Sequence, residues 1–317
     1  MPRKLTTAKE PMIAVRHLTK RYKSTVAVED LTFEVTPGHV TGFIGPNGAG
    51  KTTTMRLILG LDASTSGAAT VNGVNYRHLS APLREVGALI DANAAHPSRS
   101  AYMHLLSLAQ SNRISAARVR EVLGIVGLDM VSDRKVGSYS LGMKQRLGIA
   151  GALLGDPPVL MFDEPVNGLD PEGIVWIRQL MRAYAAEGRI VFVSSHLMSE
   201  MALTADRLIV IGQGHLLRDE GVSAFLDSDA QHRVLVRSPQ LVELRSELTK
   251  VGAHFTPGVE NSIEVTGMES SAIGELAAAH RIVLHELATL QTSLEDAFMD
   301  LTHDSVEFRT ASARVAS

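Results

Sequence analysis

The chain of 317 residues is long enough for one large domain and a smaller one. Apolar residues make up 45% and charged residues 21% of it, the ordinary proportions of a folded protein in water. The formal net charge of −3 argues against a nucleic-acid binder held by bulk electrostatics, and we expect no nucleic-acid partner. The sequence has no cysteine, which excludes disulfides and thiolate metal sites and fits a reducing compartment.

The N-terminal residues 1–11 are polar, lack the apolar core of a signal peptide and are expected to be disordered. The most apolar stretch, residues 147–162, is interrupted by Asp156, Pro157 and Pro158. It falls short of the roughly 20 apolar residues that a membrane-spanning helix needs. The sequence therefore predicts a protein that does not cross a membrane alone.

The first hundred residues combine strands with a glycine-rich loop. In "LTFEV", Leu31, Phe33 and Val35 alternate with polar residues, which is typical of a half-buried strand. The strand "VTGFIG" runs into the glycine-rich loop, and a helix is expected after it. The predicted strands are residues 12–18, 27–35, 40–45, 69–71 and 86–90, and the predicted helix is residues 51–59.

The pattern changes at about residue 101. Apolar residues then fall at three- and four-residue spacing up to residue 154, which predicts a helical subdomain. The near-continuous apolar runs "PVLMF" and "RIVFV" suit central parallel strands that helices cover on both faces. Residues 171–187 form the predicted helix between them, and "RLIVIG" with "HLLRD" predicts a closing hairpin.

A second, smaller domain is predicted to follow, and residues 221–231 lead out of the first. The predicted elements are strands at 232–238, around His254, around Ile263 and at 282–287, with helices at 241–251 and 271–280. Their order is β-α-β-β-α-β, a split βαβ arrangement. "SLEDAFMDLT" predicts a final amphipathic helix. The domains expected from sequence are 12–221, an accessory α+β domain at 222–302, and a flexible tail at 303–317.

"GPNGAGKTT" matches the phosphate-binding pattern G-x-x-x-x-G-K-[ST]. Glycines let backbone N–H groups close around phosphate oxygens, Lys51 neutralises the outer phosphates, and the Thr52 hydroxyl can bind Mg²⁺. A plain glycine-rich turn is disfavoured because an apolar strand precedes the loop and a helix follows it. The predicted phosphate-binding residues are Gly45, Pro46, Asn47, Gly48, Ala49, Gly50, Lys51, Thr52 and Thr53.

Two other predicted strands end in chemically active side chains. "VLMFDEP" places Asp163 and Glu164 at a strand end, where ligands gather in open α/β sheets. One carboxylate can hold Mg²⁺ and its neighbour can activate the attacking water. Alone, such a pair would equally suit a solvated turn. "VFVSSH" brings His196 to the same edge as a candidate γ-phosphate contact, although an isolated histidine is more often structural.

A second candidate anion site lies in "GSYSLGMKQR", where Ser140 precedes a helix that opens with Lys144, Gln145 and Arg146. Free N–H groups and the positive dipole end make a helix start attractive to anions. By itself the stretch is better explained as an ordinary helix N-cap.

Taken in order, "GPNGAGKTT", "YSLGMKQR", "VLMFDEP", "NGLDP" and "SSH" resemble the ATP-binding cassette (ABC) ATPases from about Met12 to Gly221. The resemblance implies a P-loop cassette with a RecA-like core, an antiparallel β-subdomain and a helical signature subdomain, followed here by a ferredoxin-like α+β domain. It implies catalytic roles for Lys51, Glu164 and His196, and a pair of chains packed head to tail. Each signature loop, here Ser140, Leu141, Gly142 and Met143, would cap the ATP on the partner's P-loop.

By the same resemblance, Tyr22 would stack on adenine, although a surface tyrosine is the alternative reading. Asp170 in "NGLDP" matches the loop that links the two sites. Two positions depart from the family. The signature reads Ser-Leu-Gly-Met where Ser-Gly-Gly-Gln is commonest, and Asp91 stands where glutamine is usual. An acid there adds negative charge near the γ-phosphate unless metal offsets it. The expected metal ligands are therefore Thr52, Asp163 and Asp91, with Mg²⁺ and ATP as cofactors.

The resemblance implies the ATP-hydrolysing subunit of a membrane exporter of a drug, antibiotic or peptide. It would work as a dimer, expected to be a homodimer, and would bind separate transmembrane permease subunits at the cytoplasmic face of the membrane. The alternative is a soluble ATPase of the same superfamily that acts on ribosomes or DNA. Ser140 follows Lys51 by only 89 residues, which leaves no room for the long coiled coil of genome-maintenance relatives. A nucleotide-binding regulator without turnover is disfavoured because Lys51, Asp163, Glu164 and His196 are all present.

Overall fold

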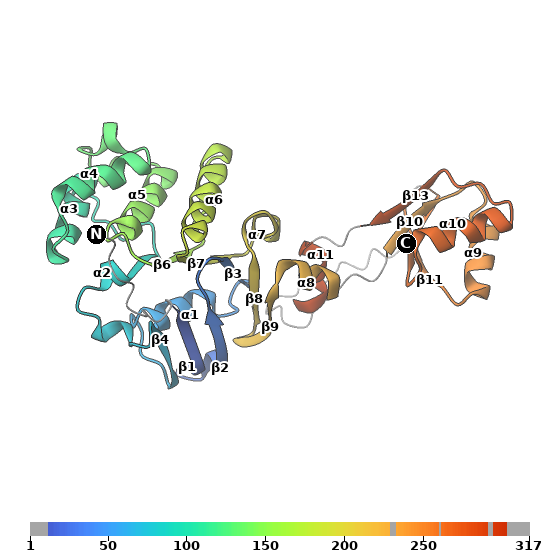
Figure 1. Cartoon of the computed structure of the whole chain (residues 1–317), viewed down its shortest axis with the longest axis horizontal. Coiled ribbons are helices and arrows are strands. Elements are labelled where there is room, and N and C mark those ends of the chain that lie inside the picture. Colours follow the sequence, from blue (N-terminus) through green and yellow to red (C-terminus); the bar gives the residue numbers. More distant parts are fainter. Residues whose placement is uncertain (1–11, 229–232, 260, 291–293, 303–317) are drawn as a thin grey trace, which may run out of the picture. The chain divides into compact units, whose positions relative to one another are not determined.

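The computed structural model describes residues 12–228, 233–259, 261–290 and 294–302 (Figure 1). Its contacts divide the chain into two compact units: the first runs up to Val222 and resumes at Leu301, and the second is Ser223–Asp300. The segments 1–11 and 303–317, predicted to be disordered and flexible, lie outside the described residues. Of the helices described, none is both long and apolar enough to cross a membrane.

A three-stranded antiparallel sheet opens the first unit. Its strands are β1 (Ile13–Tyr22), β2 (Thr25–Val35) and β4 (Ser66–Val71), in the order β2-β1-β4. Leu31, Phe33 and Val35 are buried, as their alternation predicts. Phe33 packs against Phe43 and Phe192 of the second sheet, with ring centroids 5.7 and 6.0 Å away. These rings join the two sheets into one core.

The second sheet has six strands and carries the chemistry. They are β3 (Val40–Ile44), β5 (Val86–Leu89), β6 (Val159–Asp163), β7 (Ile190–Ser195), β8 (Arg207–Gly212) and β9 (His215–Gly221), in the order β5-β6-β7-β3-β8-β9. The first five run parallel, and β9 closes the sheet as an antiparallel hairpin with β8. The carboxyl ends of β3, β7 and β6 therefore lie side by side.

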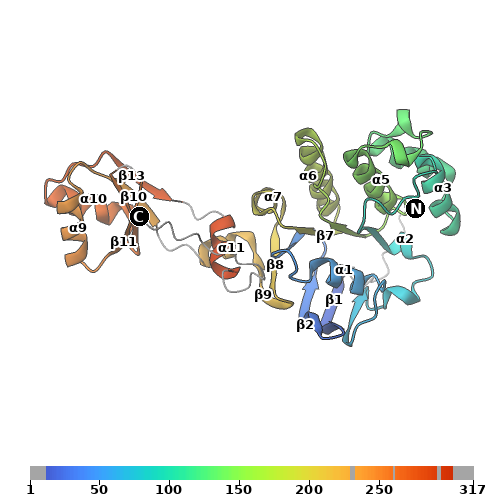
Figure 2. The ribbon, with the colours of Figure 1, turned by 180° about the vertical axis from the view of Figure 1, so that it is seen from behind.

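The helices of the first unit form two sets (Figures 1 and 2). One set follows strands of the six-stranded sheet, and the other forms the separate helical region. α1 (Lys51–Ile58) follows the glycine-rich loop, α6 (Pro171–Ala186) connects β6 to β7, and α7 (Met198–Thr204) follows β7. The predicted helical region contains α3 (Ala101–Ser111), α4 (Ala116–Ile125) and α5 (Leu141–Leu153), which confirms that prediction. Serine side chains accept hydrogen bonds at the start of all three: Ser100, Ser115 and Ser140. The shorter helical elements are α2 (Pro82–Glu85) and three 3₁₀ turns, Tyr76–His78, Asp129–Val131 and Val136–Ser138.

The second unit contains a four-stranded antiparallel sheet. Its elements are β10 (Arg233–Arg237), α9 (Leu241–Lys250), β11 (His254–Pro257), β12 (Ser262–Thr266), α10 (Ser270–Ala279) and β13 (Glu286–Leu290), with sheet order β11-β12-β10-β13. The predicted β-α-β-β-α-β order is confirmed. The unit also contains α8 (Val222–Ser228) from Ser223 on, and the predicted final helix, α11 (Leu294–Thr302), up to Asp300.

The last strand of this sheet begins later than the sequence predicts. We expected residues 282–287, but Ile282 and Val283 lie in an irregular connection. Ile282 is buried against the apolar core of the unit, and the Val283 carbonyl accepts a hydrogen bond from Ser238 Oγ at 2.7 Å. Burial of an apolar residue outside a strand produced the error.

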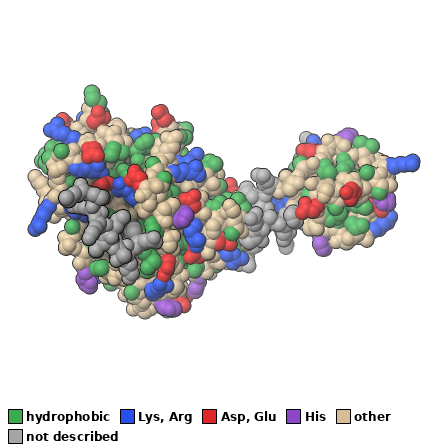
Figure 3. Space-filling model, in the orientation of Figure 1, with side chains coloured by type: hydrophobic (Ala, Val, Ile, Leu, Met, Phe, Trp, Pro, Cys, Tyr) green, Lys and Arg blue, Asp and Glu red, His purple; other side chains and the backbone are tan. Residues whose placement is uncertain are grey.

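On the face drawn in Figure 3, acidic and basic side chains are interspersed rather than gathered by sign.

Candidate nucleotide-binding site

The glycine-rich loop joins β3 to α1, and its glycines are required by sterics. A Cβ on Gly45 would lie 2.5 Å from the carbonyl oxygen of Ile211. Gly50 has a φ of +102°, and a Cβ there would lie 2.5 Å from the carbonyl oxygen of Ala27. Side chains at these positions would push the loop away from its neighbours. Because α1 begins directly at Lys51, the unpaired N–H groups of its first turn lie beside the loop and form an anion site.

An open hollow of about 440 Å³ lies over this loop. Its wall combines the loop, the start of α1 and residues from the ends of neighbouring strands. The lining residues are Ala27, Asn47, Gly48, Ala49, Gly50, Lys51, Thr52, Thr53, Glu164, Asn167 and His196. The sequence prediction placed most of these residues at one site, and the structure brings them together.

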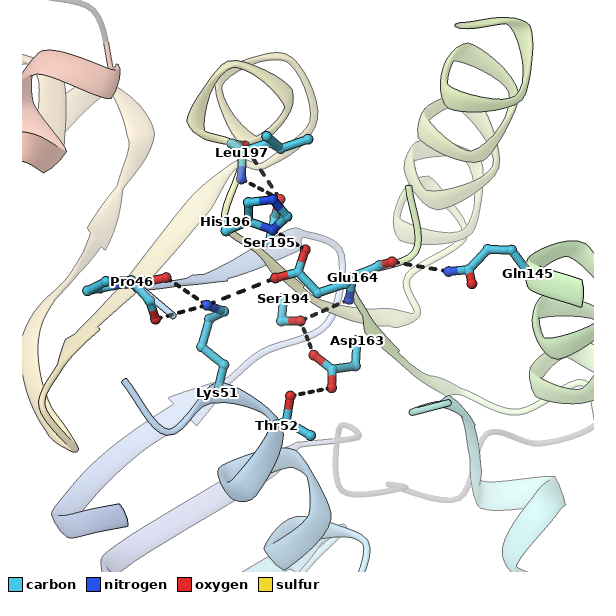
Figure 4. Close-up of polar contacts among 11 residues, drawn as sticks. Pro46, Lys51, Thr52, Gln145, Asp163, Glu164, Ser194, Ser195, His196 and Leu197 are labelled. Atoms are coloured by element: carbon cyan, nitrogen blue, oxygen red, sulfur yellow. Dashed lines mark hydrogen bonds and ion pairs between the residues drawn. The ribbon is translucent and has the colours of Figure 1, made fainter. Parts of the chain in front are cut away.

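Lys51 is 7% exposed and its ammonium group lies at the centre of the hollow's polar contacts (Figure 4). Nζ donates to the carbonyl oxygens of Gly45 at 2.6 Å and Pro46 at 3.2 Å. It also lies 3.9 Å from Glu164 Oε1. Burial lowers the pKa of Lys51, while the nearby carboxylates of Glu164 and Asp163 act in the opposite direction. A phosphate group would favour the charged form of this partly desolvated ammonium.

Asp163, the last residue of β6, is buried between two hydroxyl donors. Its Oδ2 accepts a hydrogen bond from Thr52 Oγ1 at 2.6 Å, and its Oδ1 accepts one from Ser194 Oγ of β7. A hydroxyl beside a carboxylate is a ligand pair that suits Mg²⁺, which keeps waters and substrate phosphates as its other ligands. Over the described residues, no group of three or more His, Asp and Glu side chains could form an all-protein metal cage.

Glu164 lies between Lys51 and His196, and its backbone is held in an uncommon conformation. Its φ is +50°, in the left-handed region, which costs a non-glycine residue about 1 to 2 kcal/mol. Its N–H donates to Ser194 Oγ at 3.0 Å, and its carbonyl oxygen accepts from Gln145 Nε2 at 3.1 Å. Its carboxylate Oε2 lies 2.7 Å from His196 Nδ1. The surrounding contacts thus fix both the backbone and the carboxylate of Glu164 (Figure 4).

The second candidate anion site lies apart from the first. Ser140 is the N-cap of α5, and its Oγ accepts from the Met143 N–H at 3.2 Å. Leu141 is 52% exposed. A Cβ on Gly142 would lie 2.8 Å from the carbonyl oxygen of Gly168, so this position leaves no room for a side chain. Among the described residues that line the hollow over the P-loop, none comes from Ser140–Met143.

The remaining predicted residues have partners of other kinds. Tyr22 is partly exposed, and its hydroxyl donates to Asp62 Oδ2 at 3.0 Å. Burial, followed by the contact with Asp62, raises the pKa of Tyr22. Asp170 is the N-cap of α6, where its Oδ1 accepts from the Gly173 N–H at 2.9 Å.

Asp91 is exposed two residues after the end of β5. Its Oδ1 accepts a hydrogen bond from the Asn93 N–H at 2.8 Å, which forms a tight turn. The Asn93 side chain in turn accepts from Lys144 Nζ at 3.3 Å. The described hydrogen bonds thus connect Asp91 with its own loop rather than with Thr52 or Asp163.

Four residues that contact the site were absent from the predicted set: Ala27, Gln145, Ser194 and Asn167. Ser194 follows an apolar run at a strand end, a signal that the sequence does contain. Gln145 lies four residues before the buried Ile149 and thus on the buried face of α5, where a polar side chain is unusual. Asn167 lines the hollow from the loop after β6, and its position has no sequence signal of its own.

A glycine-rich loop before a helix, a buried lysine, and carboxylates at the end of the neighbouring strand define a P-loop nucleoside triphosphatase. A family model for ABC transporters matches residues 28–167, and one for a domain of unknown function (DUF8746) matches residues 232–295. The chain is 35% identical to the uncharacterized ABC transporter ATP-binding protein YhcH of Bacillus subtilis. The aligned 306 residues cover 93% of this chain and 97% of the relative.

Two transport ATPases with named cargo are also similar. The bacitracin transport ATP-binding protein BcrA of Bacillus licheniformis is 42% identical over 211 residues, 66% of this chain and 69% of the relative. The lantibiotic transport ATP-binding protein SrtF of Streptococcus pyogenes is 34% identical over 209 residues, 66% of this chain and 90% of the relative. The chain therefore belongs to the ABC transporter ATP-binding proteins and is an ATP-hydrolysing subunit.

Solved structures agree on the fold. The ATP-binding subunit of an ABC transporter superposes with a TM-score of 0.63 at 26% identity, over 75% of this chain and 99% of that one. A dimeric ATP-binding cassette in a post-hydrolysis state with ADP and phosphate gives a TM-score of 0.61 at 23% identity, over 66% of this chain and 98% of that one. The resemblance inferred from the motifs is confirmed.

Proposed function

We propose that this ATPase powers export of a drug, antibiotic or peptide through separate transmembrane permease subunits. The observation that carries the proposal is the grouping of Lys51, Thr52, Glu164 and His196 around one hollow, in a chain related to bacitracin and lantibiotic transport ATPases. The protein would bind peripherally at the cytoplasmic face of the membrane through the permease. An ATPase that acts on ribosomes or DNA is the alternative, and the similarity to a transporter ATPase over 93% of the chain disfavours it.

In this proposal the hollow binds ATP with Mg²⁺. The P-loop N–H groups and Lys51 hold the β- and γ-phosphates, and Thr52 and Asp163 hold the metal. Mg²⁺ would supply charge neutralisation at the phosphates. Glu164 accepts the proton of the attacking water, and His196 orients the Glu164 carboxylate to which it is hydrogen-bonded. Asp91 is a further candidate metal contact, and Tyr22 a candidate adenine contact.

The Ser140–Met143 loop would bind the γ-phosphate held by a second copy of the chain. Its separation from the hollow of its own chain and the exposure of Leu141 support this assignment. The helix start at Ser140 supplies the N–H groups that an anion needs. Asp170 would lie where the two sites are linked. Two head-to-tail chains close both sites with one self-complementary surface.

We also propose that residues 12–221 are the ATPase domain and residues 222–302 an accessory domain with ferredoxin-like topology. The division of contacts near Val222 and the antiparallel strand order support this assignment.

The composite site is tested by crosslinking, without background because the chain lacks cysteine. Asn47 lines the hollow and is exposed, and Leu141 is exposed at the start of α5, so both tolerate cysteine. A chain with Asn47→Cys and a second with Leu141→Cys should crosslink only when ATP is present. Leu217→Cys, on the half-buried hairpin strand β9, serves as the unpaired control. Crosslinks that form equally without ATP, or no crosslink in the presence of ATP, would overturn the head-to-tail arrangement.

Export is tested in cells that lack the chain and carry its permease. Wild-type protein should lower the accumulation of a labelled peptide antibiotic, and Glu164→Gln should not. Membrane fractions should contain the chain only when the permease is expressed. Recovery of the chain with ribosomes instead would favour the alternative function.

A further inference from the structure

Gln145 is a buried polar side chain that the proposed chemistry does not use. It is 4% exposed and lies in the second turn of α5, five residues after Ser140. Its Nε2 crosses to the main chain of Glu164, nineteen residues away, and donates to that carbonyl oxygen at 3.1 Å (Figure 4). A buried amide that makes one directed hydrogen bond to another segment constrains both segments.

The segment that it contacts is held by hydrogen bonds from several elements. Glu164 has a left-handed φ of +50°, which persists only where neighbouring groups hold it. Ser194 holds its N–H from β7, and Gln145 holds its carbonyl oxygen from α5. The same carbonyl also accepts from the Asn167 N–H at 3.2 Å within the local loop. Gln145 is therefore a contact through which α5 acts on Glu164.

The start of α5 is fixed to the rest of the unit by the next residue as well. The Arg146 guanidinium lies 4.7 Å from the ring centre of Trp176 on α6, and its Nη1 donates to the Val126 carbonyl oxygen at 3.0 Å. Ser140 and Gln145 are also close together on the helix, because five residues of helix span only about 7.5 Å. A displacement of Ser140 would therefore move Gln145 with it.

We propose that Gln145 is a positioning residue that ties the start of α5 to Glu164 of the same chain. This inference rests on the proposed head-to-tail dimer. In that dimer Ser140 contacts the partner's nucleotide, while Gln145 holds the general base of the chain's own site. Closure of one composite site onto ATP is then transmitted to the carboxylate that hydrolyses ATP in the other.

The test separates action within a chain from action on the partner. Two differently tagged full-length chains are combined, and one carries Glu164→Gln so that only the site with the intact Glu164 turns over. Gln145→Met is then placed either on the chain with the intact Glu164 or on the chain with Glu164→Gln. Methionine keeps the length of the side chain and removes the donor.

On the chain with intact Glu164, the substitution should lower kcat about tenfold with KM for ATP within about twofold, as expected for one lost directed hydrogen bond. On the other chain it should leave kcat unchanged. Equal losses from both placements, or a loss only from the second, would overturn the proposal. Failure of the dimer itself is distinct, because the crosslink would then be missing between an Asn47→Cys chain and a Leu141→Cys chain that carry no change at Gln145 or Glu164.

A pH profile excludes a merely structural effect. Gln145→Glu places a carboxyl group against the Glu164 carbonyl oxygen, and burial raises the pKa of such a group. The ionised form lacks a donor, whereas the protonated form donates. Relative to wild type, kcat of Gln145→Glu should therefore recover as the pH falls, while the Gln145→Met deficit stays constant. Equal, pH-independent deficits would count against the hydrogen bond.

Two controls accompany these variants. Gln110→Met makes the same change at an exposed position of α3 and should leave kcat unchanged. Fluorescence of Trp176, the single tryptophan of the chain, reports whether α5 still packs against α6. Its emission should be the same in Gln145→Met and wild type. Hydrogen exchange across residues 163–169 should be faster in Gln145→Met than in Gln110→Met even without ATP, and equal rates would contradict the proposed hold on Glu164.

Discussion

Ser194 supports two functional residues through one hydroxyl group, which makes Ser194→Ala a sharp perturbation. The side chain is fully buried at the end of β7. Its Oγ donates to Asp163 Oδ1 and accepts from the Glu164 N–H at 3.0 Å. Alanine removes both interactions and leaves the buried carboxylate with the single donor from Thr52.

The magnitude follows from the charge of the partner. A hydrogen bond to an ionised group contributes about 1.5 to 3 kcal/mol, and a bond between neutral groups about 1 kcal/mol. The Glu164 N–H retains a longer contact with the Ser194 carbonyl oxygen at 3.3 Å, so its loss is partial. We expect Ser194→Ala to lower the free energy of unfolding by about 2 to 3 kcal/mol.

Ser195→Ala is the matched control on the next residue. Ser195 is also buried on β7, but the hydrogen bonds of its Oγ within the described part of the chain go to the backbone of Leu197, whose N–H donates to it at 2.9 Å. The expected loss is about 1 kcal/mol. Urea unfolding at 25 °C, followed by Trp176 fluorescence, measures both, because this single tryptophan lies on α6 in the first unit. Equal shifts of the midpoint for the two variants would refute the argument from charge.

Other variants test the site in different ways. Glu164→Gln should preserve ATP binding, lower turnover by roughly 10²- to 10⁴-fold and accumulate an ATP-bound dimer on size exclusion; wild-type turnover would remove Glu164 from the mechanism. Burial lowers the Lys51 pKa from 10.5, so the folded chain releases this proton at lower pH than the unfolded chain. The free energy of unfolding of wild type, minus that of Lys51→Met, should therefore rise with pH between the lowered pKa and 10.5. If urea titrations show that this difference does not change with pH, burial does not lower the pKa of Lys51. Asp91→Asn keeps an acceptor for the Asn93 N–H and should alter the Mg²⁺ dependence of hydrolysis; an unchanged titration would leave Asp91 a loop residue.

The sequence predicted the hollow because its parts follow from local patterns and one topological rule. The P-loop, Asp163, Glu164 and His196 each come directly after an apolar strand. Parallel strands end at the same edge, so these residues meet without knowledge of side-chain detail. The structure adds the register of β6 beside β7, which pairs Asp163 with Ser194. Strand adjacency of this kind is set by packing across the sheet and has no local signature.

The contacts of α5 were harder to predict, for a related reason. Ser140 shows the pattern of an N-cap in the sequence, and it is one in the structure. Whether the same helix start also binds a partner's phosphate depends on a surface that one chain cannot complete. The role of Gln145 depends on how α5 packs against the loop after β6, a contact between segments that the sequence pattern treats separately.

The anion site at Ser140 and the buried side chain of Gln145 belong to the same helix, and one arrangement accounts for both. An anion site at the end of a helix has little value to its own chain when the nucleotide is bound elsewhere, and here the hollow over the P-loop includes none of Ser140–Met143 among its described lining. A polar side chain buried one turn further along has a cost unless its hydrogen bond is used. Both features become consistent if α5 contacts one nucleotide at its start and holds the catalytic carboxylate of another through Gln145. The arrangement makes the first two turns of the helix a link between two sites, and substitutions of Ser140 and of Gln145 in mixed dimers can separate the two contacts.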